Sequence, residues 1–157
     1  MKNSAQFSLA VHTMLMVAYF PKLHITSSMV AVSAGCHPVI IRNAFSKLRE
    51  AGLLITKSGK GKTELARPAD EITLLDIYKA VEGDDAGSIF KIHSSPLGLC
   101  PIGGNIQSLL GSHLTDAANA MQRELSRITL QGLIDELKAQ QRGILPAPES
   151  EHKKEGL

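Results

Sequence analysis

Residues 26–52 read TSSMVAVSAGCHPVIIRNAFSKLREAG, and the helix signals in this stretch decide the fold. Thr26 or Ser27 can cap a first helix of about two turns, which Gly35 ends. After a break of three residues, Pro38 takes the first position of a second helix, where a missing amide proton costs nothing. The stretch therefore predicts two helices that meet across a tight turn.

The second helix, which His37 can cap and Gly52 ends, has two distinct faces. At 100° per residue, one face holds Ile41, Ala44, Phe45 and Leu48, and the other holds Val39, Arg42, Asn43, Ser46 and Glu50. The first face is apolar and should pack inward. The second carries a guanidinium, an amide and a hydroxyl, which can address guanine, adenine or phosphate in a DNA major groove. An ordinary amphipathic helix with a solvated outer face is the alternative.

The segment TKSGKGKT, residues 56–63, resembles a nucleotide-binding loop of the pattern G-x-x-x-x-G-K-[ST]. Thr56 stands where that pattern needs its first glycine, and Pro68 follows where the loop should open into a helix. Strand-like runs, LLIT and TELA, flank the segment, and Gly59 and Gly61 supply the permissive backbone of a reversal. The sequence therefore predicts a hairpin with lysines at its tip, for which a solvated loop is the alternative.

The order of the predicted elements is typical of a winged helix-turn-helix. A further helix in residues 3–20, which Asn3 or Ser4 can cap and Pro21 stops, precedes the two helices and the hairpin. In this fold the second helix of the pair enters the major groove, and the hairpin, or wing, lies along the backbone or minor groove. We expect a mainly α fold with a small β wing, and a DNA-binding domain over residues 1–83.

Composition and charge agree with a nucleic-acid partner. The 157 residues are 43% hydrophobic, which is enough for the core of one domain with an appendage, and 4% aromatic, which excludes broad stacking platforms for single strands. Residues 1–68 hold nine basic and two acidic residues, a net charge of +7, whereas the remainder has eight basic and thirteen acidic residues, a net charge of −5. This division indicates a DNA-binding module joined to a different module.

The second half of the chain predicts a dimer. TLLDIYKAVEG, residues 73–83, reads as a helix with Thr73 and Asp76 spaced as a capping box, and residues 84–100 read as a loop. Residues 101–140 are expected to form a dimerisation helix region, because one helix cannot bury their apolar stripe alone. The stripe is Ile106, Leu110, Leu114, Ala117, Met121, Leu125 and Ile128, which Leu130, Leu133, Ile134 and Leu137 either extend or fold back upon. Intramolecular packing is the alternative.

Three stretches carry a resemblance to a known family. SSMVAVSAGCHPVIIRNAFSKLREAGLL, LARPADEITLLDIYKAVEG and GLCPIGGNI resemble the Rrf-type family of bacterial transcription regulators over about residues 1–140. The family includes sensors of iron–sulfur cluster status and nitric oxide, and repressors of cysteine metabolism. The resemblance implies a homodimer that binds a double-stranded DNA operator with two-fold symmetry. Residues 141–157, rich in proline and charge, are expected to be a flexible tail.

The resemblance also implies which residues contact DNA. Ser27 and Ser28 open the positioning helix, residues 37–43 form the reading end of the recognition helix, and residues 58–68 are the wing. The wing departs from the commoner glycine, glycine, tyrosine, arginine form, because Lys62, Thr63 and Glu64 stand there. The predicted DNA-binding residues are Ser27, Ser28, His37, Pro38, Val39, Arg42, Asn43, Ser46, Lys47, Lys57, Lys60 and Lys62.

The two cysteines are too few for a disulfide framework and lack metal-ligand spacing. Members of the resembling family that hold an iron–sulfur cluster use three cysteines in the loop where this chain has only Cys100, and one thiolate cannot supply the ligands of a cluster. His93 and His113 could lend nitrogen but show no metal-site spacing. We therefore expect no cofactor and no metal.

Cys100 is the predicted redox-sensing residue of the loop over residues 84–100. It precedes Pro101, a favoured first residue of a helix, and the positive end of a helix dipole stabilises the oxidisable thiolate. The alternative is a small buried apolar side chain, which is the usual state of a free cysteine. Cys36 lies in the tight turn and is expected to be a packing residue.

No catalytic set recurs at motif spacing, so we expect no enzyme activity. The sequence shows no secretory signal and no apolar run near the roughly 20 residues that span a bilayer, so we expect a cytoplasmic protein without a membrane partner. It predicts a homodimeric, sequence-specific transcription regulator, a repressor that responds to thiol oxidation or a related stress signal. The alternatives are a DNA-binding protein without redox sensing and a winged-helix module for protein contact.

Overall fold

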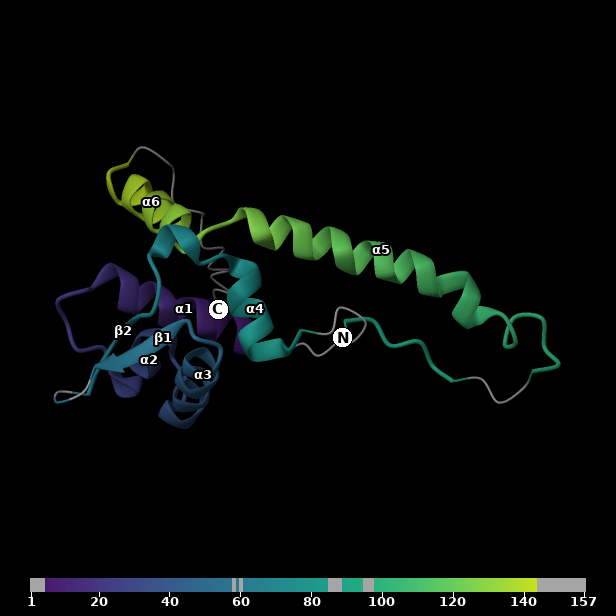
Figure 1. Cartoon of the computed structure of the whole chain (residues 1–157), viewed down its shortest axis with the longest axis horizontal. Coiled ribbons are helices and arrows are strands. Elements are labelled where there is room, and N and C mark those ends of the chain that lie inside the picture. The colour runs from purple at the N-terminus through teal and green to yellow at the C-terminus, as the bar shows by residue number, and fades with distance from the viewer. Residues whose placement is uncertain (1–4, 58, 60, 85–88, 95–97, 144–157) are drawn as a thin grey trace, which may run out of the picture.

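The computed structural model describes residues 5–57, 59, 61–84, 89–94 and 98–143. The elements are α1 (Gln6–Tyr19), α2 (Ser27–Ala34), α3 (Pro38–Glu50), β1 (Leu54–Lys57), β2 (Lys62–Leu65), the 3-10 helix η1 (Ala69–Glu71), α4 (Leu74–Glu82), α5 (Ile106–Arg127) and α6 (Leu130–Gln141). Figure 1 shows α1 to α4, the β1–β2 hairpin and α6 gathered into one body, from which α5 extends outward. The predicted mainly α fold with a small β wing is confirmed.

The helix-turn-helix forms at the residues that the sequence marks for it. The Thr26 hydroxyl caps α2 by accepting a backbone N–H at 3.2 Å, and Gly35 ends α2 with a left-handed φ of 68°. Nδ1 of His37 accepts the N–H of Val39 at 3.3 Å, and Pro38 takes the first position of α3. The two predicted helices and the turn between them are confirmed.

One core joins both halves of the chain. The predicted apolar face of α3 is buried in full, and α3 packs against α1, α2, α4 and β1. The core residues outside α3 include Ala10, Met14, Val17, Val30, Ala31, Leu54, Ile77, Leu130 and Ile134. The packing of α6 residues with residues of α1 fixes the end of the described chain against its beginning.

Helix α1 begins differently from the prediction. The expected caps, Asn3 and Ser4, lie outside the described residues, and Ala5 occupies the N-cap position without a side-chain hydrogen bond. The helix ends at Tyr19, two residues before Pro21, as its stop signal predicts. Burial of its inner face, not a capping side chain, therefore stabilises α1.

The wing is the predicted hairpin. Strands β1 and β2 pair antiparallel, with Leu54 opposite Leu65 and Lys57 opposite Lys62. Gly59 at the tip and Gly61 before β2 both have a positive φ, 98° and 61° respectively. Residues with a Cβ atom rarely adopt this backbone conformation. Residues 58 and 60 lie outside the described residues.

A capping box and a short backbone bridge position α4. The Thr73 hydroxyl accepts the Asp76 N–H at 3.2 Å, and the Asp76 carboxylate accepts the Thr73 N–H at 2.9 Å, as predicted. Thr73 also pairs antiparallel with Thr129, through bonds from Leu74 N–H to Ile128 and from Leu130 N–H to Ile72. These two bonds, 2.9 and 2.8 Å long, join the start of α4 to the end of α5.

The long helix begins later and ends earlier than expected. Pro101 is not its first residue, because residues 101–105 form turns before α5 starts at Ile106. The helix ends at Arg127, and a new helix, α6, starts after Thr129, whose hydroxyl caps α6 by accepting the N–H of Gly132 at 3.0 Å. Within the described residues, no helix has both the length and the apolar character needed to cross a membrane.

Helix α6 folds back on its own chain. Leu130 and Ile134 are buried in the core, and the Tyr19 hydroxyl donates to Oε1 of Gln141 at 2.8 Å. Intramolecular packing therefore holds for α6. Gln141, which the prediction placed in the tail, is the last residue of α6, and residues 144–157 lie outside the described residues. The described residues between 84 and 100 form neither helix nor strand, in agreement with the predicted loop.

Candidate nucleic-acid interface

The outer face of α3 presents polar side chains to solvent. Arg42, Asn43 and Ser46 are exposed, and Val39 is 46% exposed beside them. These side chains point away from the buried face because four of every seven residues of an amphipathic helix fall outside its apolar stripe. The structure therefore brings the predicted base-reading residues together on one helical surface.

The turn and the start of α2 border this surface. Ser28 and His37 are exposed, whereas Ser27 and Pro38 are half-buried at the first positions of α2 and α3. Helices α2 and α3 pack directly against each other. The predicted contacts from the turn are thus adjacent to α3, with His37 already engaged through Nδ1 in capping that helix.

Lys47 is directed elsewhere. Its ammonium donates to Oε1 of Gln6 and to the carbonyl oxygen of Val81, both at 3.3 Å, and the residue is half-buried. These acceptors belong to α1 and α4, so the charge lies between two helices of the body. The prediction that Lys47 contacts DNA is not supported by this placement, because its amine already has two protein partners.

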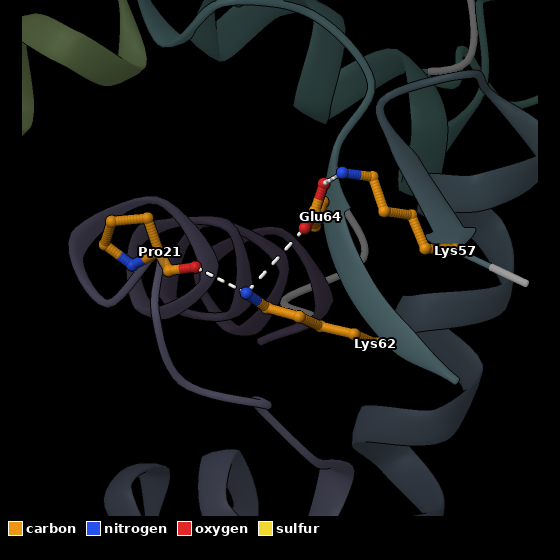
Figure 2. A network of polar contacts seen from close by, with 4 residues as sticks. All are labelled: Pro21, Lys57, Lys62 and Glu64. Carbon is orange, nitrogen blue, oxygen red and sulfur yellow. Dashed lines mark hydrogen bonds and ion pairs between the residues drawn. The ribbon is translucent and has the colours of Figure 1, made fainter. Parts of the chain in front are cut away.

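The wing lysines are held by Glu64. Figure 2 shows the Glu64 carboxylate between two ammonium groups, with Lys57 at 2.9 Å and Lys62 at 3.7 Å. Lys62 also donates to the carbonyl oxygen of Pro21 at 2.7 Å, and its side chain is only 26% exposed. The side chain of Lys57 is 65% exposed, while Lys60 lies outside the described residues. Of the two described wing lysines, Lys57 is therefore the more accessible.

This network also changes the pKa of the Glu64 carboxyl group. The hydrogen bond from Lys57 is the main reason that the pKa of the Glu64 carboxyl is lowered below its usual value, and the positive charge of Lys62 adds to the effect. The lowered pKa extends the ionised range of Glu64 to more acidic pH, and its negative charge offsets part of the positive charge of the wing. The sequence showed Glu64 as a departure from the commoner wing pattern but did not show its two partners.

A groove beside α3 contains two arginines. It has a volume of about 200 Å³, lies between the segment before α2, the side of α3 and the start of β2, and is lined by His24, Ile25, Thr26, Ser27, Arg42, Phe45, Arg49, Gly61 and Thr63. The Arg49 guanidinium lies over the ring of Phe45, 5.6 Å from its centroid. Arg49 and His24 are not among the DNA-binding residues predicted from the sequence. For Arg49 a signal existed, because it stands seven residues after Arg42 and hence on the same side of α3.

Cys100 is exposed, and nearby backbone amides act on its thiol. Hydrogen bonds from the backbone amides of Gly103 and Ile102 lower the pKa of the Cys100 thiol. Pro101 does not begin a helix, so the helix dipole expected at Cys100 is absent there, and the two amides that act on the thiol belong to a turn. The alternative of a buried apolar residue does not hold within the single chain.

The remaining candidate donors are scattered. Cys36 is half-buried in the α2–α3 turn and packs against the core, as predicted. His93 and His113 are both exposed. Across the described ranges, no group of three or more His, Cys, Asp or Glu side chains is placed to hold a metal ion.

Comparison with known sequences gives one family and a set of regulators. Residues 3–136 match the sequence model of Rrf2, described as an iron-dependent transcriptional regulator. Over 134 residues the chain is 27% identical to YwnA of Bacillus subtilis (strain 168), whose name places it among HTH-type transcriptional regulators. That alignment covers 85% of this chain and 98% of YwnA.

Solved structures share the fold along most of the chain. A crystal structure from Lactobacillus plantarum, named as a transcriptional regulator, matches with a TM-score of 0.71 and 25% identity over 89% of this chain and 94% of that one. The oxidised form of CymR from Staphylococcus aureus matches with a TM-score of 0.60 and 27% identity over 85% of this chain and 95% of CymR. The similarity therefore extends beyond the helix-turn-helix to the long helix.

Proposed function

Because the chain belongs to the Rrf2 family of DNA-binding transcriptional regulators, we propose that it binds operator DNA as a homodimeric repressor. The family is one of regulators and not of enzymes. The exposed polar face of α3, with Arg42, Asn43 and Ser46 beside each other, is the observation that carries the proposal. These side chains supply the bidentate donors and acceptors that distinguish base pairs in a major groove.

In the proposed complex, residues 1–83 form the DNA-binding unit. The reading surface of α3 enters the major groove, and the exposed Ser28, His37 and Lys57 lie toward the sugar-phosphate backbone. Such contacts fix the position of the protein on DNA without reading its sequence. A regulator that binds chromosomal DNA in this way acts in the cytoplasm, and double-stranded DNA is its partner.

The exposure of helix α5 supports the proposal of a homodimer. It has 22 residues, about 33 Å of helix, yet Ala118 is its only buried residue. Leu109 is 58% exposed and Leu110 is 39% exposed, in the half of α5 that extends away from the body (Figure 1). An apolar stripe of this length is stabilised by an identical helix of a second copy, related by a two-fold axis. The two α3 helices then face an operator with the same symmetry.

The side chains of this chain do not fit an iron–sulfur cluster, although the family description is iron-dependent. Such clusters are held by three or four thiolates. The whole sequence contains only Cys36, in the α2–α3 turn, and Cys100, before α5. The exposed His93 and His113 do not join them in a ligand set among the described residues. No step of the proposed function therefore uses a cluster.

We propose that Cys100 instead responds to oxidants, in a sensor loop over residues 84–100. Its exposure and lowered pKa favour the thiolate, which attacks a peroxide oxygen to give a sulfenic acid and the reduced leaving group. The similar CymR of Staphylococcus aureus has been crystallised in an oxidised form, which supports this signal class for a protein of this fold. Oxidation would add polarity next to the start of the proposed dimerisation helix.

The proposal is tested by selection from genomic DNA fragments with reduced protein, with mild peroxide, and with Cys100→Ser. We expect enrichment of a two-fold symmetric sequence, which peroxide releases from the wild type and not from Cys100→Ser. Enrichment that is indifferent to peroxide would overturn the redox signal and leave DNA recognition intact. Absence of enrichment would overturn DNA recognition itself and favour a module for protein contact.

Glu64→Gln is expected to strengthen binding to operator and random DNA alike, by about two- to fivefold at moderate salt. The change removes a negative charge from the wing and frees the exposed Lys57 ammonium to meet a phosphate, while Lys62 keeps its bond to Pro21 (Figure 2). The measurement is the dissociation constant as a function of salt, which should become steeper. Glu136→Gln removes the same charge from α6 and should change neither quantity; equal effects of both variants would mean that only net charge matters.

A further inference from the structure

The groove between α3 and the wing is a basic surface. Of the described residues that line it, none is acidic, and two, Arg42 and Arg49, are permanently charged. Within the described part of the chain neither arginine forms an ion pair, whereas Lys57 and Lys62 share Glu64 and Arg67 contacts Asp76. The groove therefore holds positive charge that is available to an anion.

The two arginines occupy different places on the same side of α3. They are seven residues apart, about 10.5 Å along the axis, so Arg42 lies in the second turn and Arg49 in the last. In helix-turn-helix complexes the N-terminal part of the recognition helix meets base edges, and its C-terminal end can reach the backbone. Position along α3 thus separates a base-reading arginine from one suited to a phosphate.

The Arg49 guanidinium contacts the face of the Phe45 ring in the absence of any ligand. The Phe45 ring is 4% exposed and belongs to the core, so its orientation is fixed, and the Arg49 guanidinium lies 5.6 Å from its centroid. A guanidinium over a ring face still has N–H groups that can form paired hydrogen bonds to phosphate oxygens. The contact with Phe45 also reduces the side-chain entropy that binding would otherwise cost.

We propose that this groove binds one phosphodiester group of the DNA backbone, with Arg49 as the principal ligand and Phe45 as its positioning residue. The inference rests on the proposed function, since it names a phosphate contact of the same interface. His24, Thr26 and Ser27 line the wall opposite α3 and supply further polar groups. Arg49 then contributes affinity and register, while Arg42 contributes sequence preference.

The test compares Arg49→Ala, Arg49→Lys and Arg123→Ala on operator and random duplexes over a range of salt. Arg49→Ala should weaken both by about three- to tenfold and lower the log–log salt slope by about 0.9, the value for one phosphate. Arg49→Lys should keep the slope and lose part of the affinity, because lysine has no planar fork. Arg123 is the matched control, because it is exposed on α5 outside the apolar stripe of the proposed dimer, and its replacement should leave both quantities unchanged.

Neutral methylphosphonate groups, placed one at a time in the operator, locate the contact. One position should weaken the wild type and leave Arg49→Ala unaffected, because the ligand is already absent. Competition by inorganic phosphate tests whether the groove binds a free anion instead of DNA. A free anion would be the occupant if millimolar phosphate weakens DNA binding more than chloride does at equal ionic strength, and if Arg49→Ala abolishes this difference. That result would overturn the proposed contact with the DNA backbone.

Two failures remain distinguishable. If the wild type binds no operator, the proposed function fails. If the wild type binds and Arg49→Ala shows an unchanged salt slope with no coupled methylphosphonate position, only the phosphate groove fails. A double variant, Arg42→Ala with Arg49→Ala, should combine a loss of base preference with a lower slope, since the two arginines act on different parts of DNA.

Discussion

Replacing Leu110 with aspartate is expected to convert the protein to a monomer and to lower operator affinity by about 10² to 10⁴. The expected loss follows because a dimer engages its second half-site at a high effective concentration, which a monomer does not have. Leu110 lies in the outer half of α5 and is 39% exposed in the single chain, so a charge there interferes with a partner and not with the body. Sedimentation equilibrium and operator titration measure the two effects.

Ser112→Asp is the matched control for this change. Ser112 is exposed and lies about 200° around α5 from Leu110, outside the apolar stripe. Its replacement by aspartate introduces the same charge into the same helix. The control should remain dimeric. At a concentration low enough for the wild type to be monomeric, the free energy of unfolding of Leu110→Asp should stay within about 0.5 kcal/mol of that of the wild type. A Leu110→Asp protein that still sediments as a dimer would place the interface elsewhere.

Arg42→Ala should cost about 1 to 3 kcal/mol of operator binding and relax the preference at a single base position. The reason is that Arg42 has no ion-pair partner among the described residues and lies exposed on the reading face of α3, so its bidentate donors are free to pair with a guanine. Binding to operators substituted at each position in turn measures the effect.

The comparison with random DNA decides how Arg42 acts. A base contact makes the loss larger on the operator than on random duplex, and it disappears on the operator whose contacted base pair is already replaced. An equal loss on every duplex, accompanied by a lower salt slope, would make Arg42 a phosphate ligand like the one proposed for Arg49. Arg42→Lys should retain affinity for random DNA and still lose the base preference.

Much of the fold could be predicted because its signals are local. Thr26, His37 and Pro38 act within three residues of themselves, and the capping box of Thr73 and Asp76 spans a single turn. The buried face of α3 followed from helical periodicity alone. These features specify the helix-turn-helix before any distant part of the chain is considered.

Distant partners explain what the sequence could not show. The place of Lys62 in the wing predicts a contact with DNA, but the oxygen that accepts its hydrogen bond, the carbonyl of Pro21, lies 41 residues away in the sequence. Lys47 meets Val81 across 34 residues. The end of α5 likewise depends on the pairing of Thr129 with Thr73, since periodicity continues through that point. Long-range geometry of this kind leaves no periodic or motif signal near the residue concerned.

The bridge between Thr73 and Thr129 fixes one end of α5 to the body, while the other end extends away from it. Its two backbone bonds anchor the end of α5 at the body, while the start of the helix and the turn with Cys100 lie at the far end (Figure 1). An arm of about 33 Å moves its tip by about 0.6 Å for each degree of rotation at its fixed end. In the proposed dimer, we therefore expect a chemical change at Cys100 that alters the angle of α5 to change the distance between the two α3 helices.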